Sequence, residues 1–300
     1  MIFVRDQVDA LRRLPGVEIE VRRFQPGAWS YPRAAVSLWR AARRGGFELV
    51  HAHYGLSGWS ALTAGGPLVV TFHGTDLRHR VVGPLSRSLA RLIPLPAAVS
   101  TSLACKWLPG AGRRRRVAVL PCGVNLDRFG QRDRREARAA LGLDPLRPYV
   151  LFAADPSRAV KRYDRARSLI EALPRVELLT LQRIAPDDVP NWVNAANAVV
   201  VTSDEEGFGL AALEALACNV PVLSTPVGVA PIALTGLDGV LCAPFEPERW
   251  LEALRPHIEH DDPRIAGRER AQLFSTERMA QRVLAAYREL APASTSHQRS

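Results

Sequence analysis

One short stretch of carboxylates and glycines could bind a charged ligand, because it follows an apolar run and leads into an apolar helix. Residues 199–201 are three valines with strand character, and residues 203–209 read Ser-Asp-Glu-Glu-Gly-Phe-Gly. At the end of a parallel strand, a glycine turn lets a ligand approach the backbone, and the next helix offers free N–H groups to phosphate oxygens. Acidic residues at a helix start are also ordinary structural features. The stretch alone leaves both interpretations open.

Glu214 is the more unusual residue of this segment. Its neighbours at 210–213 and 215–217 are all apolar, so this helix should be buried on most faces. A carboxylate left there without a partner would be unfavourable by several kcal/mol. Glu214 must therefore reach either a protein cation or the hydroxyl groups of a ligand. A second carboxylate two turns after Glu206 could hold a polyol.

A basic loop after the apolar run at 149–154 supplies Arg158 and Lys161. Such a loop is most often a solvated surface. Beside a ligand, however, its cations would stabilise the charge that develops on a leaving diphosphate.

Histidines follow two further apolar runs. His53 ends the run at 49–53, and His73 follows the run at 68–72, with Asp76 three residues later. A single histidine at the end of a strand is usually structural, so these residues alone do not establish a site.

Taken together, these segments resemble the motifs of glycosyltransferase family 4, also called glycosyl transferases group 1. Residues 206–222 read Glu-Gly-Phe-Gly-Leu-x-x-x-Glu-Ala-x-Ala-x-x-x-Pro-Val, which is similar to the hallmark of that family. The His-Gly-x-Asp at 73–76 resembles its first-domain motif, and the motifs occur in the expected order over nearly the whole chain. Asn219 stands where the family usually has Gly. Asp155 stands where it usually has Arg, so Arg158 is the expected substitute.

The resemblance implies a role for each matching residue. Glu206 would contact the donor sugar, Glu214 would hold the ribose hydroxyls, and the cationic loop would contact the diphosphate. The implied catalytic residues are His73, Glu206 and Lys161. The implied donor-binding residues are Arg158, Lys161, Glu206, Gly207, Phe208, Gly209 and Glu214. The implied acceptor-side residues are His53 and Asp76, and no metal ligand is implied.

The elements that must position these residues alternate along the chain. Short apolar runs separated by helical segments indicate βαβ units and a parallel sheet. The fold class is therefore α/β, and the resemblance implies GT-B: two Rossmann-like, doubly wound domains facing across a cleft. Helical spacing is expected at 3–13, 32–44, 163–173, 209–217, 248–257, 262–273 and 276–290. Alternating residues at 17–21 predict a strand with one polar face.

The predicted domain organisation has five parts. Residues 1–124 form an incomplete acceptor-side domain, and 125–148 form a charged, loop-like linker. Residues 149–275 form the nucleotide-sugar-binding domain, 276–290 form a closing helix that returns to the first domain, and 291–300 form a disordered tail. Family members normally open with a buried strand and a glycine turn, whereas Met1 already sits at a helix. We therefore expect the first strand to be missing, through a misassigned start or truncation.

Composition limits the partners of the chain. It has 300 residues, 47% of them hydrophobic, and a formal net charge of +10, which calls for an anionic partner. No aromatic-interleaved basic stripe or zinc motif is present, so nucleic acid is excluded. The four cysteines are widely spaced, as expected for reduced thiols in a cytoplasmic protein. The basic residues around Trp39 leave open a peripheral contact with anionic lipid at the inner face of the cell membrane, against the alternative of a solvated face.

The predicted activity is metal-independent, retaining transfer of a sugar from a nucleotide-diphosphate-sugar to a hydroxyl of a glycan, lipid-linked or small-molecule acceptor. No cofactor is expected beyond the co-substrate, a UDP- or GDP-sugar. The alternative is a non-catalytic nucleotide-sugar-binding relative, degraded by truncation. The spacing of Glu206 and Glu214 argues against a nucleotide-sugar epimerase.

Overall fold

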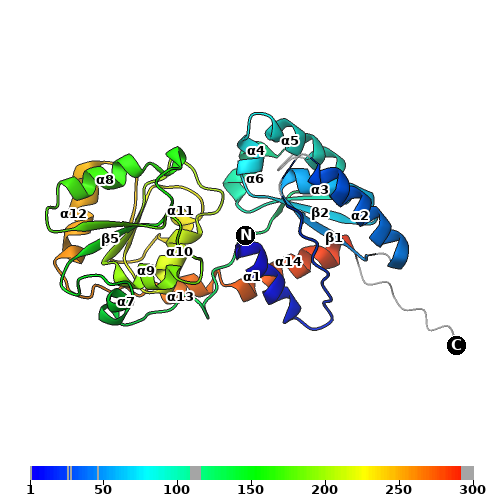
Figure 1. The fold of residues 1–300 in the computed structure, drawn as a ribbon. Helices are drawn as coiled ribbons and strands as arrows, with labels where there is room; N and C mark the ends of the chain where they lie inside the picture. Colours follow the sequence, from blue (N-terminus) through cyan, green and yellow to red (C-terminus); the bar gives the residue numbers. More distant parts are fainter. Residues whose placement is uncertain (1, 26, 28, 46, 109–115, 292–300) are drawn as a thin grey trace. The chain divides into compact units, whose positions relative to one another are not determined.

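The computed structural model describes residues 2–25, 27, 29–45, 47–108 and 116–291, and the chain divides into two compact units. The first unit holds Phe3–Pro121 and the chain from Met279 onward, and the second holds Cys122–Arg278. Met1 and residues 292–300 of the expected tail at 291–300 lie outside the described residues. Each unit is an α/β structure around one parallel sheet (Figure 1).

The first unit has a four-stranded sheet in the order β1-β2-β3-β4, with every neighbouring pair parallel. Its strands are β1 (Val50–His53), β2 (Leu68–Phe72), β3 (Leu95–Ala98) and β4 (Ala118–Val119). Its helices are α1 (Ile2–Arg12), α2 (Ser30–Gly45), α3 (Gly55–Ala61), η1 (Leu62–Ala64), α4 (Thr75–Arg78), α5 (Val82–Leu92), α6 (Thr101–Trp107) and most of α14 (Thr276–Leu290).

Two groups of helices cover this sheet. Side chains on consecutive strand residues point to opposite faces. Val69 therefore joins the core that α1 and α14 build, through Leu11 and Val283 among others. Val70 faces the opposite side, where α3 approaches so closely that only Gly58 fits against it. Burial of these apolar faces, at about 25 cal/mol per Å², is the main term that holds the unit together.

The second unit has a five-stranded parallel sheet in the order β6-β5-β7-β8-β9. Its strands are β5 (Tyr149–Phe152), β6 (Glu177–Thr180), β7 (Ala198–Val201), β8 (Val222–Ser224) and β9 (Leu241–Cys242). Its helices are α7 (Arg134–Ala140), η2 (Ala159–Lys161), α8 (Tyr163–Glu171), α9 (Val189–Ala195), α10 (Leu210–Ala217), α11 (Ala230–Ala233), α12 (Pro247–Ile258) and α13 (Arg268–Gln272). The helices α8 and α12 pack on one face around the fully buried Trp250 (Figure 1).

The prediction of a strand at 17–21 is wrong. Residues 17–25 have no regular secondary structure, and no described strand pairs with them. The alternation of Val17 and Ile19 with polar residues has a different cause, because both side chains pack against the core beneath α1 and α14. A strand needs a partner for its backbone N–H and C=O groups, and alternation alone does not supply one.

The segment at 125–148 also differs from the expected loop-like linker. It contains α7, it belongs to the second compact unit, and it buries two of its arginines. Arg134 is 2% exposed and donates to the carbonyl oxygens of Asn194 and Pro263. Burial, the largest cause, lowers the pKa of Arg134 to about 9. These two arginines therefore bond to the rest of the second unit rather than to water.

Candidate active site

The topology of the second sheet marks one position where a ligand site is expected. From β5 the chain passes to β6 on one side and then returns to β7 on the other side of β5. In open parallel sheets, ligands bind outside the carboxyl ends of the strands at such a switch point. The loop after β5 is the basic loop with Arg158 and Lys161. The loop after β7 is the glutamate-glycine stretch at 203–209.

Lys161 and Glu206 meet at this edge of the sheet. Lys161 ends η2 after β5, and its Nζ donates to Oε1 of Glu206 at 2.5 Å. The hydroxyl of Ser203 donates to the same oxygen at 2.8 Å. The lysine and glutamate side chains are 13% and 12% exposed, so both charges are largely withdrawn from water. An ammonium group has three N–H donors. Lys161 can therefore keep Glu206 and still bind an oxygen of a ligand.

Hydrogen bonds between neighbouring loops hold this pair in place. The hydroxyl of Thr202 donates to the carbonyl oxygens of Lys161 and Arg162, which fixes the β5 loop against the end of β7. The hydroxyl of Thr225, after β8, donates to the carbonyl oxygen of Ser203 at 2.6 Å. Three adjacent strand ends are thus joined through two threonines.

The turn from β7 into α10 depends on glycine. Gly209 precedes α10 with φ of 89°, in the left-handed region that side chains disfavour. Gly228 has φ of 57°, and a Cβ atom there would lie 2.2 Å from the carbonyl oxygen of Phe208. That carbonyl accepts a hydrogen bond from the N–H of Val229 at 2.7 Å. The backbone of 207–209 is therefore held close to the loop after β8.

Glu214 lies on the open stripe of α10. Five of the eight residues of this helix are buried, as the apolar sequence predicted, while Leu210, Ala211 and Glu214 are partly exposed. The carboxylate lies close enough to Cys218 to contribute, after burial as the main cause, to a thiol pKa raised to about 12. Among the three partly exposed residues of α10, which begins beside the glycine turn, Glu214 is therefore the polar one.

Arg158 is less closely tied to this arrangement than Lys161 is. It is exposed, and its guanidinium makes no hydrogen bond to any residue that the structure describes. Nearby, the backbone and hydroxyl of Ser157 donate to Asp155 and hold the pKa of that carboxyl below its ordinary value, with a smaller contribution from Arg158. The expected substitution of Arg158 for a family arginine stays a prediction.

The first unit gathers three histidines at the carboxyl ends of β1 and β2. Nδ1 of His53 and Nε2 of His73 are 3.0 Å apart, so one nitrogen donates and the other accepts. Burial lowers the pKa of His53 to about 4, and burial followed by the charge of His53 lowers the pKa of His73. The pair is therefore neutral near pH 7, and the proton between the rings couples their tautomers.

His51 belongs to the same cluster, although only His53 of this stretch was predicted as a site residue. Its ring stacks on that of His53 with centroids 4.6 Å apart. Its Nδ1 lies 2.6 Å from the hydroxyl of Tyr287 on α14, and its Nε2 lies 2.8 Å from the hydroxyl of Thr71. Burial, the largest cause, lowers the pKa of His51 well below its ordinary value. Only the fold brings Tyr287 to this cluster, since 236 residues separate it from His51.

Asp76 joins the two loops that carry the histidines. Its carboxylate accepts backbone N–H groups from Gly55 at 3.1 Å, His73 at 3.1 Å and Gly74 at 3.0 Å. Burial raises the pKa of Asp76, and these hydrogen bonds oppose the shift. The contacts make Asp76 a support for the backbone at the histidine pair.

Sequence reasoning missed several residues that position the site. Their signal was weak, because single hydroxyl, aromatic and glycine residues carry no spacing pattern. They are His51, Thr71, Thr202, Ser203, Thr225, Gly228 and Tyr287. The described residues contain no group of three or more His, Cys, Asp or Glu side chains arranged to hold a metal ion. None of the helices in the described ranges combines the length and apolar character needed to cross a membrane.

Solved structures of other proteins share this architecture. A sucrose-phosphate synthase from Thermosynechococcus elongatus aligns with a TM-score of 0.72 and 22% identity, over 98% of this chain and 94% of that one. Alr3699/HepE from Anabaena, solved with UDP and glucose, aligns with a TM-score of 0.68 and 18% identity, over 90% of this chain and 86% of that one. The two parallel-sheet units therefore have the GT-B fold.

Sequence comparisons identify the family. The model of Glycosyltransferase Family 4 matches residues 2–128, and that of Glycosyl transferases group 1 matches residues 149–260. A D-inositol 3-phosphate glycosyltransferase from Catenulispora acidiphila is 32% identical, over 81% of this chain and 72% of its own. Another from Streptomyces avermitilis is 29% identical, over 89% of this chain and 72% of its own. The chain belongs to glycosyltransferase family 4, as the motif resemblance predicted.

Proposed function

We propose that this enzyme transfers a sugar, with retention and without a metal, from a nucleotide-diphosphate-sugar to a hydroxyl group of an acceptor. The observation that carries the proposal is the meeting of Lys161 and Glu206 at the topological switch point, next to the glycine turn that opens α10. A cation, a carboxylate and backbone N–H groups at a helix start are the chemistry that a sugar diphosphate needs.

Each residue has one task in the proposed reaction. Lys161, with Arg158 nearby, offsets the negative charge that grows on the diphosphate as the bond to the sugar breaks. The N–H groups at 207–210 bind phosphate oxygens, and Glu206 accepts hydrogen bonds from hydroxyls of the sugar. Glu214 holds the ribose hydroxyls. A donor phosphate oxygen takes the proton of the acceptor hydroxyl, so that attack occurs on the face the diphosphate leaves.

The histidine pair of the first unit belongs to the same proposal. His73 contacts the transferred sugar through the nitrogen that His53 does not engage. The neutral state of both rings avoids a positive charge beside a sugar hydroxyl. The acceptor is a glycan, a lipid-linked sugar or a small polyol. The names of the curated relatives, D-inositol 3-phosphate glycosyltransferases, support the last of these.

A thermal-shift screen against UDP-, GDP- and ADP-sugars tests donor binding. At a concentration of 100 Kd, a ligand adds ~2.7 kcal/mol of stability, which is roughly 5–10 °C for a unit of this size. We expect one donor class to give this shift, and Glu214→Ala to weaken its affinity by about tenfold or more, because a charged hydrogen bond is lost. Glu171→Ala, which removes an exposed glutamate of α8 in the same unit, is the matched control.

Turnover separates an enzyme from a protein that only binds the donor. The enzyme releases nucleoside diphosphate when D-inositol 3-phosphate or another polyol acceptor is added, and the release falls in Lys161→Gln. A donor that binds without any release would support the non-catalytic alternative. No shift with any of the three nucleotide classes, or equal shifts in Glu214→Ala and Glu171→Ala, would contradict the donor site.

A further inference from the structure

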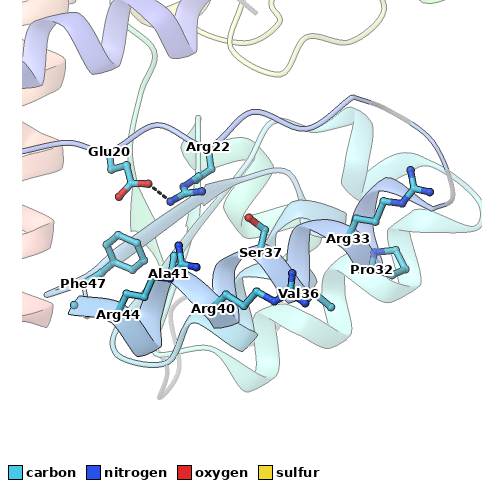
Figure 2. Close-up of a pocket in the computed structure, with 11 residues that line it drawn as sticks. Glu20, Arg22, Pro32, Arg33, Val36, Ser37, Arg40, Ala41, Arg44 and Phe47 are labelled. Carbon is cyan, nitrogen blue, oxygen red and sulfur yellow. Dashed lines mark ion pairs between the residues drawn. The ribbon is translucent and has the colours of Figure 1, made fainter.

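A hollow of about 810 Å³ lies in the first unit between α2 and the extended segment at 17–25. Its volume falls within the 300–1,000 Å³ typical of small-molecule sites. Figure 2 shows Glu20 and Arg22 on one side and a row of α2 side chains on the other. Nothing in the donor site or the histidine cluster uses these residues.

The lining of this hollow is strongly cationic. It contains four arginines, Arg22, Arg33, Arg40 and Arg44, and one carboxylate, Glu20. Arg22 and Glu20 already form an ion pair with each other (Figure 2). Within the described part of the chain, the other three guanidiniums have no carboxylate partner. Three positive charges therefore border one hollow without an internal counter-charge.

The positions of the arginines along α2 are unfavourable for a helix face that only contacts water. Arg33, Arg40 and Arg44 are seven and four residues apart, so they lie in one row along the helix. Arg40 and Arg44 are a like-charge pair at i,i+4, which disfavours the helix. Arg33 lies near the N-terminal end, where the helix dipole disfavours a cation and where α2 has no acidic residue. An external anion would remove both disadvantages.

We infer that this hollow binds a phosphate-bearing ligand. A guanidinium offers a planar pair of N–H donors that matches a phosphate group in a bidentate manner. At 1.5 Å per residue, the row spans roughly 16 Å along the helix, which is longer than one phosphate. Pro32, Val36 and Phe47 add apolar wall for the organic part of the ligand. The ligand is a soluble phosphorylated small molecule or the headgroup of a phospholipid, which share this chemistry.

The experiment uses the full chain carrying Lys161→Gln, which weakens phosphate binding at the proposed donor site. Isothermal titration with pyrophosphate measures the soluble source. Sedimentation with phosphatidylglycerol–phosphatidylcholine vesicles, compared with phosphatidylcholine alone, measures the lipid source. The pocket variants are Arg40→Gln and Arg44→Gln. The control is Arg43→Gln, which removes the same charge from the same helix but lies outside the lining, over the ring of Trp39.

The expected result is binding of pyrophosphate, of phosphatidylglycerol vesicles or of both, weakened about tenfold by each pocket variant, since each loses a charged hydrogen bond. Arg43→Gln should change the affinity less than twofold. Binding of pyrophosphate alone assigns a soluble ligand, and binding of vesicles alone assigns a lipid. Absence of both kinds of binding, or equal losses in Arg43→Gln and the pocket variants, overturns the inference. Because every variant carries Lys161→Gln and leaves the rest of the donor site unchanged, the differences between Arg43→Gln and the pocket variants do not depend on the donor site.

Discussion

The ion pair of Lys161 and Glu206 should be strongly coupled, and a double-mutant cycle measures that coupling. The N–O distance of 2.5 Å gives an attraction of about 7 kcal/mol at an effective dielectric constant of about 20. Withdrawing the two charges from water costs several kcal/mol each, and the side chains are only 13% and 12% exposed. These costs enter the single substitutions and cancel in the cycle. Since couplings between contacting residues are about 0.5–3 kcal/mol, we expect a coupling free energy of about 2 kcal/mol for this pair.

The cycle consists of Lys161→Met, Glu206→Gln and the double variant, with urea unfolding of the second unit followed by circular dichroism. Lys161→Met should cost about 2–3 kcal/mol, because Glu206 then keeps only the hydrogen bond from Ser203. The double variant should cost less than the sum of the single variants. The exposed pair of Arg167 and Glu171 provides the reference cycle, with about 0.3–0.5 kcal/mol expected. A coupling free energy for Lys161 and Glu206 no larger than this reference would show that their short distance and burial do not couple the two charges strongly.

Three further predictions follow from the same structure. Gly228→Ala should lower the unfolding free energy by at least about 2 kcal/mol, because its Cβ would lie 2.2 Å from the carbonyl oxygen of Phe208; a melting temperature unchanged from wild type would count against that contact. Acidification from pH 6.5 to 4 should destabilise the first unit by up to about 3 kcal/mol through His53, because its pKa of about 4 lies below the unfolded value and the unfolded state takes up the proton first. Unfolding curves at pH 7, 5.5 and 4.5 should show this fall in the unfolding free energy. An unfolding free energy that does not change with pH would oppose the prediction. Arg134→Ala should cost about 3–5 kcal/mol and Arg147→Ala, at an exposed ion pair, less than 1 kcal/mol; denaturant midpoints that move equally would show that burial of Arg134 is not what matters.

The sheet edges that carry the candidate site were predictable from the sequence. Apolar runs at 149–152 and 198–201 form adjacent parallel strands, and the carboxyl ends of such strands share one edge. The side chains that follow them, Lys161 and Glu206, therefore meet despite their separation of 45 residues. Glu214 was recognisable because one carboxylate interrupts an otherwise apolar helix.

Other features depend on contacts that no local pattern encodes. The charges of Arg134 and Arg138 indicated side chains exposed to solvent. Instead, their guanidiniums donate to the carbonyl oxygens of Asn194 and Ala195, about 60 residues away in the sequence. Likewise, Tyr287 reaches His51 only because α14 packs on the sheet of the first unit. Long-range partners of this kind are set by the whole fold.

The most direct test of the central claim is a crystal structure of the chain with the nucleoside diphosphate that the thermal-shift screen selects. Phosphate oxygens should lie within hydrogen-bonding distance of Nζ of Lys161 and of the backbone N–H groups at 207–210, with the ribose hydroxyls on the carboxylate of Glu214. A nucleotide bound away from the ends of β5 and β7, with the carboxylate of Glu214 held by an arginine or lysine of the protein instead, would contradict it.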